Sequence, residues 1–208
     1  MRTKSLALTA LAVAALPFGA HAQDFEGTVT YRMSMAGMTM EMTQFIKGKK
    51  LRQEMAGPMG NMVVIMDSEA GKMSMSAPGQ PPMVMDIESM KAMAGAEAQA
   101  AAQADIEVSA TGEKETIAGH DCEHFLIKQA TNETDVCAAT GLGFHMSSME
   151  GGVGGGAAPA GWEKLRDRFA DGFFPLKMTT TTPQGSMVME AVTLEKKSLS
   201  DDLFKIEG

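Results

Sequence analysis

Apolar and polar residues alternate with a period of two along several short stretches of the chain. In residues 25–35 the apolar side chains include Val29, Tyr31, Met33 and Met35, and Thr, Arg or Ser stands between them. This period is typical of a half-buried β-strand, because successive side chains of a strand point to opposite faces. Further strands, separated by turns rich in Gly, Pro and Asp, are expected at residues 38–48, 50–55, 62–67, 72–76 and 82–87. Short successive strands with tight turns predict an antiparallel meander.

The second half of the chain continues this pattern and adds two helical segments. Residues 88–104 are rich in Ala, Gln and Met, which favours a helix packed against the sheet or across its mouth. Trp162, Leu165 and Phe169 recur at helical spacing, so a short amphipathic helix is expected there. The predicted fold class is mainly β but α+β: a curved antiparallel sheet, or half-barrel, that wraps two or three helices. The later strands are expected at 106–110, 115–118, 120–129, 133–138, 174–181 and 186–194.

The first 22 residues have the three parts of a secretory signal peptide. Arg2 and Lys4 supply positive charge, residues 6–16 are apolar and uncharged, and residues 20–22 read Ala-His-Ala, with small residues at the two positions that a cleavage site needs. The apolar stretch is shorter than the roughly 20 residues that span a bilayer. We therefore expect cleavage after residue 22 and export to a bacterial periplasm.

Cleavage leaves residues 23–208, whose 186 residues are enough for one domain with its own core. Two low-complexity insertions are expected in this domain, near 94–104 and 151–161. The signal segment holds two of the 18 basic residues and no acidic one, so the formal charge of the rest is −10. An acidic chain without basic clusters repels phosphate backbones, which argues against nucleic acid as a partner. No other apolar run is long enough to cross a membrane.

Both cysteines lie in the exported part of the chain, at Cys122 and Cys137. Nearby cysteines usually pair in an oxidising compartment, and this bridge would contribute about 3 kcal/mol by closing a loop of about 15 residues. The alternative is a Cys₂His₂ zinc site with His120 and His124, because these two residues and Cys122 alternate and so share a face of a strand.

Three segments of the chain resemble a known family. The first spans residues 112–125 and reads G-E-x-x-T-I-A-G-x-x-C-x-x-F; the others are residues 172–176 (GFFPL) and 202–206 (DLFKI). Together they resemble the exported domain of unknown function family 4412, which is similar in outline to the periplasmic lipoprotein carriers with a LolA/LolB-like half-barrel. The resemblance implies a curved antiparallel sheet that wraps around helices and leaves an apolar cavity. It implies a fold and a compartment more than an activity.

Methionine is unusually frequent in the exported part, and much of it occurs in Met-x-Met pairs. Residues two apart point to the same face of a strand, so these pairs are expected to line one surface of the sheet. A Met-lined concave sheet would be an adaptable apolar pocket for an acyl chain or another hydrophobic guest. The expected lining residues are Val29, Tyr31, Met33, Met35, Met38, Met40, Met42, Met62, Met66, Met73, Met75, Met83, Met85, Met187 and Met189.

Two other interpretations of the methionines stay open. In the first, Met simply fills the core in place of Leu, Ile and Val. In the second, the thioethers bind Cu(I) or Ag(I), because soft neutral sulfur suits these ions and does not have to lose a proton. A weaker variant makes exposed Met a sacrificial sink for oxidants. The metal ligands would be the densest run, with His145 as a further candidate: Met33, Met35, Met38, Met40, Met42 and His145.

The sequence carries no recognisable catalytic motif. It has no Gly-x-Ser-x-Gly, no His-Glu-x-x-His and no phosphate-binding glycine loop, and its carboxylates are scattered. We therefore expect a non-enzymatic periplasmic binding or carrier protein, without a cofactor, whose partner is a hydrophobic small molecule or a lipoprotein acyl chain. The alternatives are a Cu(I)/Ag(I) binding or copper-tolerance protein and an envelope structural or interaction protein. The oligomeric state is not readable from the sequence.

Overall fold

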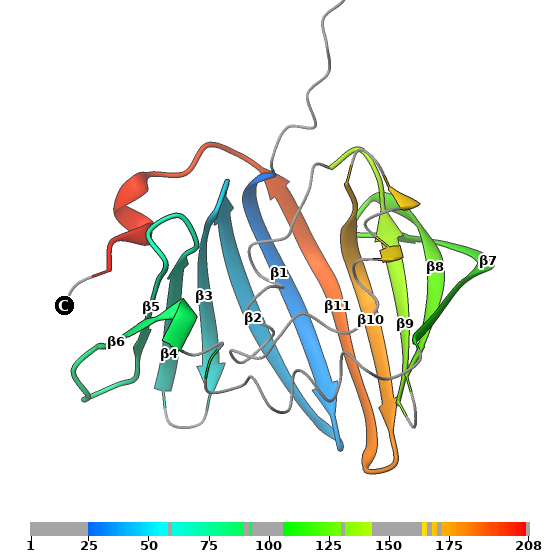
Figure 1. The fold of residues 1–208 in the computed structure, drawn as a ribbon, viewed down its shortest axis with the longest axis horizontal. Coiled ribbons are helices and arrows are strands. Elements are labelled where there is room, and N and C mark those ends of the chain that lie inside the picture. Colours follow the sequence, from blue (N-terminus) through cyan, green and yellow to red (C-terminus); the bar gives the residue numbers. More distant parts are fainter. Residues whose placement is uncertain are drawn as a thin grey trace, which may run out of the picture.

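Eleven antiparallel strands form one open sheet in the computed structural model (Figure 1). The structure describes residues 25–57, 60–89, 92, 106–129, 132–142, 164–165, 168–169 and 172–206. The strands are β1 (Glu26–Met35), β2 (Met38–Lys47), β3 (Lys50–Gly57), β4 (Gly60–Asp67), β5 (Lys72–Ser76), β6 (Met83–Asp86), β7 (Ile106–Ile117), β8 (His120–Gln129), β9 (Asn132–Ala139), β10 (Phe174–Thr182) and β11 (Gly185–Lys196).

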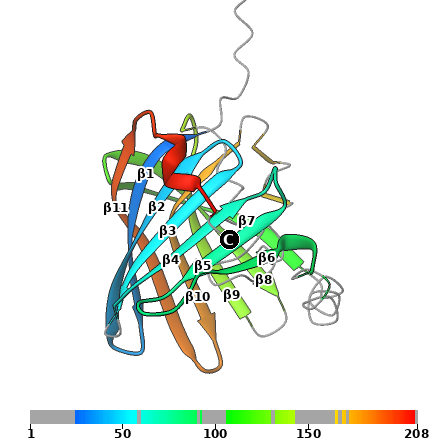
Figure 2. The ribbon, with the colours of Figure 1, turned by 90° about the vertical axis from the view of Figure 1, so that its left-hand side faces the viewer.

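The sheet consists of two meanders joined at the centre. Its strand order is β6-β5-β4-β3-β2-β1-β11-β10-β9-β8-β7, so the first and last strands of the chain pair with each other and β6 and β7 form the edges. Figure 2 shows β1 and β11 on one side of the molecule and the β6 edge on the other, with strands of the two halves crossing at a steep angle. The sheet is therefore strongly curved and twisted.

Two hairpins close through two-residue turns in the left-handed region. Ala36 and Gly37 have φ of 50° and 81°, and Ala118 and Gly119 have φ of 49° and 80°. Positive φ at both central residues is the mark of the type I′ turn, whose twist matches that of antiparallel strands. The first turn fixes the register between β1 and β2 and sets Met35 directly opposite the first residue of β2.

The predicted α+β class, with two or three helices, is wrong. Within the described residues the longest helical element is the 3₁₀ turn η1 (Asp201–Phe204), and α-helical backbone is limited to fragments at 87–89, 92, 164–165 and 168. Most of the predicted helix at 88–104 lies outside the described residues. Helix propensity is a weak prior, and the curved sheet closes much of its core with side chains from its own strands. None of the described helical segments is long and apolar enough to cross a bilayer.

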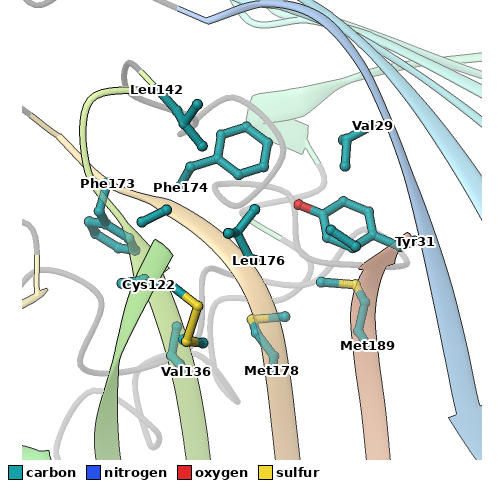
Figure 3. Packing of buried hydrophobic residues seen from close by; sticks show 14 of the residues in the cluster. Val29, Tyr31, Cys122, Val136, Leu142, Phe173, Phe174, Leu176, Met178 and Met189 are labelled. Carbon is teal, nitrogen blue, oxygen red and sulfur yellow. A yellow bond between two sulfur atoms is a disulfide. The ribbon is translucent and has the colours of Figure 1, made fainter. Parts of the chain in front are cut away.

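The core lies on the concave face, and Figure 3 shows its centre, where β1, β10 and β11 meet. The rings of Phe25 and Phe174 lie 5.0 Å apart across this region. Tyr31 is buried, and its hydroxyl donates a 3.0 Å hydrogen bond to the carbonyl of Pro175, which ties β1 to β10 across β11. Burial raises the pKa of the Tyr31 phenol, so this hydroxyl stays protonated.

One helical turn contributes to the core where the second helix was predicted. Leu165 is fully buried, and its carbonyl accepts a hydrogen bond from the amide of Phe169. The Phe169 ring contacts Phe125 of β8 edge-on, with ring centroids 5.2 Å apart. The structure therefore has a helical turn at Leu165 and Phe169, where their spacing predicts a helix. Trp162 lies outside the described residues.

Candidate functional site

Methionines of neighbouring strands lie directly opposite one another on the concave face. Met33 of β1 pairs with Met40 of β2 on one side and with Met189 of β11 on the other, and Met189 pairs with Met178 of β10. Directly opposed residues of antiparallel strands point to the same face, with Cβ atoms about 4.5–5.5 Å apart. These four side chains therefore form a continuous row across four strands.

The other methionines of the described strands extend this row into a surface, here called the methionine face. The strand register places all these methionines on the same side of the sheet as Tyr31. Met42, for example, lies directly opposite Tyr31. The further cross-strand groups are Met187–Met35–Met38, Met42–Met55–Met62, Met66–Met73–Met85 and Met75–Met83. The structure thus brings the predicted lining residues onto one face, and their role in binding stays a prediction.

The methionine face changes from buried to exposed along its strands. Met42 and Met189 are 0% and 3% exposed and belong to the core. Beyond them, Met35 and Met38 are 50% and 60% exposed. The other exposed methionines of the described residues are Met40, Met62, Met75 and Met83. Core filling accounts for the first group but not for the second, because exposed positions of a sheet ordinarily carry polar residues.

The opposite face of the β1–β2 hairpin is polar. Arg32 and Glu41 form an ion pair of 3.5 Å, and the hydroxyls of Ser34 and Thr39 lie 3.4 Å apart. These pairs occupy the positions between the methionines of the same strands. The hairpin is therefore amphipathic up to its tip, and its apolar side is left open to solvent there.

A cavity of about 450 Å³ lies on the other, convex face, between β3–β5 and the turn η1. Arg52 of its lining faces away from the methionine face, because its neighbour Leu51 pairs with Met66. The Arg52 guanidinium donates to the carboxylate of Glu54 and to the carbonyl of Leu203. This mixed, charged lining does not suit a purely apolar guest.

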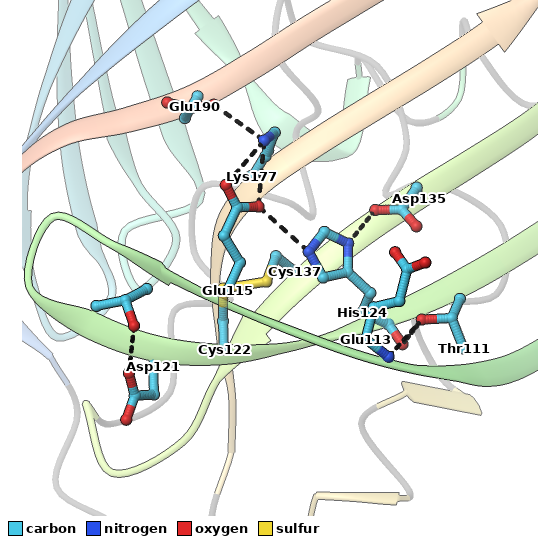
Figure 4. Close-up of a disulfide and its surroundings, with 11 residues drawn as sticks. Thr111, Glu113, Glu115, Asp121, Cys122, His124, Asp135, Cys137, Lys177 and Glu190 are labelled. Carbon is cyan, nitrogen blue, oxygen red and sulfur yellow. Dashed lines mark hydrogen bonds and ion pairs between the residues drawn. A yellow bond between two sulfur atoms is a disulfide. The ribbon is translucent and has the colours of Figure 1, made fainter.

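A charged network covers the convex side of the other meander (Figure 4). The His124 ring lies between two carboxylates, with Nδ1 2.6 Å from Asp135 and Nε2 3.3 Å from Glu115. The Lys177 ammonium then bridges Glu115 and Glu190, each at 3.2 Å. From the sequence, His124 was considered as a candidate zinc ligand and Glu115 was assigned no role. Only the cross-strand register, which sequence alone does not give, brings these residues together from five strands.

The predicted disulfide between Cys122 and Cys137 is confirmed, with an S–S distance of 2.08 Å between β8 and β9. The pairing removes both thiolates, so the alternative zinc site with His120 and His124 is wrong. The same bond rules out Cys137 as a thiolate ligand beside Glu115 and His124, although the ligand atoms of these three residues lie within 4.8 Å of one another. A disulfide of this kind is typical of an oxidising compartment.

Opposed effects act on the pKa of the Lys177 ammonium. Desolvation by burial lowers this pKa and is the largest single effect. The hydrogen bonds and charges of Glu115 and Glu190 together outweigh it, and they hold the pKa above its usual 10.5. The Lys177 side chain therefore stays protonated between Glu115 and Glu190 at all physiological pH values.

This shift predicts a pH dependence of stability. A raised pKa means that the stability contributed by Lys177 is complete below pH 10.5, its unfolded value, and is lost as pH rises through the folded pKa. A Lys177→Gln variant is expected to be less stable than the wild type at neutral pH, by a difference that narrows above pH 10.5. Urea unfolding of both proteins across this range measures it, and a difference that does not change with pH would contradict the assignment.

The family model of a domain of unknown function, DUF4412, matches residues 25–207. The chain belongs to this family. The DUF4412 match covers all three segments whose resemblance was noted in the sequence, so that expectation is confirmed. Among curated proteins no significant match was found.

Solved structures are similar to this DUF4412 chain at low sequence identity. A chain in the Pseudomonas aeruginosa MucA/MucB complex superposes with a TM-score of 0.50 at 10% identity, over 90% of this chain and 57% of that one. A crystal structure of MucB gives 0.47 at 10% identity, over 90% and 60% of the two chains. A structure of PNGF-II gives 0.46 at 18% identity, over 87% and 30%. The DUF4412 chain thus spans little more than half of the first structure, and the likeness concerns the fold alone.

Proposed function

We propose that this protein is a non-enzymatic binding protein of the bacterial periplasm that takes a hydrophobic ligand, an acyl chain, on its methionine face. The observation that carries the proposal is the continuity of this face, from the buried Met42 and Met189 to the exposed Met35, Met38 and Met40. An apolar patch that remains exposed on a soluble domain marks an interaction site. Unbranched thioethers adapt their shape to a guest better than the β-branched residues that strands prefer.

A buried amide supports a guest that has one polar end. Gln53 of β3 lies on the methionine face between Leu51 and Met55, and it is 5% exposed. Its Nε2 atom is buried and has no hydrogen-bond partner among the residues that the structure describes. An unpaired buried donor is costly, and an acceptor brought in by a guest would remove that cost. The carboxyl or ester oxygen of an acyl chain is such an acceptor.

We propose a non-enzymatic role because the charged network around His124 and Lys177 does not have the arrangement of a catalytic site. Both ring nitrogens of His124 contact carboxylates. The Lys177 ammonium forms ion pairs with Glu115 and Glu190. A general base needs a nitrogen directed at a substrate or at a nucleophile. The network instead joins five neighbouring strands, and a scaffold role accounts for it.

The experiment is a binding titration with a fluorescent palmitate analogue. Replacing Met35, Met38 and Met40 by Gln keeps the length of each side chain but makes the surface polar. We expect this variant to bind at least about tenfold more weakly than the wild type, because burial of apolar area contributes about 25 cal/mol per Å². Mass spectrometry of protein purified from the periplasm is expected to show copurified lipid in the wild type only.

The matched control changes the other face of the same hairpin. A Ser34→Gln, Thr39→Gln variant alters a directly opposed pair that points away from the methionines. Its affinity for the analogue is expected to equal that of the wild type. If the wild type binds no analogue and copurifies with no lipid, or if both variants weaken binding equally, the proposal is wrong.

A further inference from the structure

The ends of the β1–β2 and β10–β11 hairpins bring five methionines together. Met35 lies directly opposite Met38 on one neighbouring strand and opposite Met187 on the other. In the next row, Met33 lies directly opposite Met40. Figure 1 shows the two hairpins side by side at the same end of the sheet. These five residues, Met33, Met35, Met38, Met40 and Met187, are here called the tip cluster.

The tip cluster is accessible and made only of thioethers. Met35, Met38 and Met40 are exposed, and Met33 and Met187 are half-buried. The charged pair of the same hairpin, Arg32 and Glu41, occupies positions between the methionines and so points to the other face. A cation that reaches this surface meets soft, neutral sulfur rather than carboxylate oxygen.

We propose that the tip cluster is a binding site for a soft monovalent cation, Cu(I) or Ag(I), centred on Met35, Met38 and Met187. Opposed Cβ atoms on neighbouring strands lie about 4.5–5.5 Å apart, and each sulfur stands two bonds beyond its Cβ. Flexible side chains on three adjacent strands can therefore direct their sulfurs to one ion. Thioethers prefer Cu(I) and Ag(I) to the harder divalent ions, and they bind without releasing a proton.

This assignment differs from the ligand set expected from the sequence. Met42 was included there, but it is fully buried in the core and does not reach the tip. Met187 was not included as a metal ligand, because it follows Met35 by more than a hundred residues and only the β1–β11 register brings it close. His145 lies outside the described residues.

The test is a titration of the exported protein with Ag(I), which needs no reductant and so leaves the disulfide intact. Uptake is followed by native mass spectrometry and by the ¹³C-methyl resonances of labelled methionine. The variant Met35→Leu, Met38→Leu, Met187→Leu removes the sulfurs and keeps the apolar surface. We expect it to bind Ag(I) at least about tenfold more weakly than the wild type, with unchanged thermal unfolding.

The matched control is Met62→Leu, Met75→Leu, Met83→Leu, which removes three exposed sulfurs from the same face away from the tip. It is expected to bind Ag(I) like the wild type. Wild-type uptake is also expected to be the same at pH 5 and pH 7.5, because thioethers do not titrate. No uptake by the wild type, equal losses in the two variants, or uptake that falls at pH 5 would each overturn the assignment.

The metal-site proposal and the hydrophobic-ligand proposal can be tested separately. Leucine keeps an apolar surface, so the Met→Leu tip variant is expected to lose much less affinity for the palmitate analogue than the Met→Gln variant does. Glutamine removes both the sulfur and the apolar surface, so only the Met→Gln variant loses both ligands. A tip variant that keeps palmitate and loses Ag(I) separates the two proposals.

Discussion

A Gly27→Ala substitution is expected to destabilise the protein by at least about 3 kcal/mol, the upper range for overpacking a core. A Cβ atom at this position would lie 2.1 Å from the carbonyl oxygen of Glu195 and 2.9 Å from the Phe25 ring. Gly27 belongs to β1 and Glu195 to β11, so the two strands that join the meanders would have to separate. The clash is with backbone, which cannot move away as a side chain can.

The comparison that isolates this effect is Gly48→Ala. Gly48 has a φ of 56°, and nothing lies within 4 Å of the Cβ position. Its substitution by Ala only places an L-residue in the left-handed backbone region, which lowers the stability by about 1–2 kcal/mol. Urea unfolding followed by far-UV circular dichroism gives both values. If Gly27→Ala costs no more than Gly48→Ala, the β1–β11 junction is not packed as described.

Removal of the disulfide is expected to cost about 3 kcal/mol. The Cys122–Cys137 bond closes a loop with a sequence separation of 15, and its main effect is to restrict the unfolded chain. In a domain of this size the loss corresponds to a fall in Tm of roughly 6–12 °C. Calorimetry of a Cys122→Ala, Cys137→Ala variant measures this fall.

Reduction of the wild type provides the control for that variant. A thiol reductant is expected to lower the Tm of the wild type toward that of the double variant and to leave the variant unchanged. Both cysteines are buried, so complete reduction requires the protein to open first. A double variant that melts with the wild type would show that the loop is already ordered without the bond.

Much of the sheet was predictable because its signals are local. Alternation in residues 25–35, and the Ala36-Gly37 turn that follows, predicted β1 and the hairpin to β2. The same alternation predicted that Met33 and Met35 share a face. It did not predict how far each side chain is buried. Met42 is buried and Met38 is exposed, although both follow the same alternation. The difference arises because the hairpin extends past the end of the core.

The parts that were missed depend on contacts between distant residues. β1 pairs with β11 across most of the chain, and this pairing alone brings Met187 beside Met35. The network of Glu115, His124 and Lys177 likewise exists only once register is fixed. The α+β class was wrong because helix propensity is a weak prior: within the described residues helical backbone is limited to short fragments, and most of the Ala-rich segment 88–104 lies outside them.

The central claim is that the exposed end of the methionine face is the part that receives a ligand, and methyl NMR tests it most directly. Protein labelled with ¹³C at the methionine methyl groups is titrated with palmitate. We expect the resonances of Met35, Met38 and Met40 to shift with a common affinity, while those of Met178 and Met189, in the core, stay in place. Palmitate that leaves all of these methyl groups unperturbed, or that perturbs them without regard to exposure, would contradict the account.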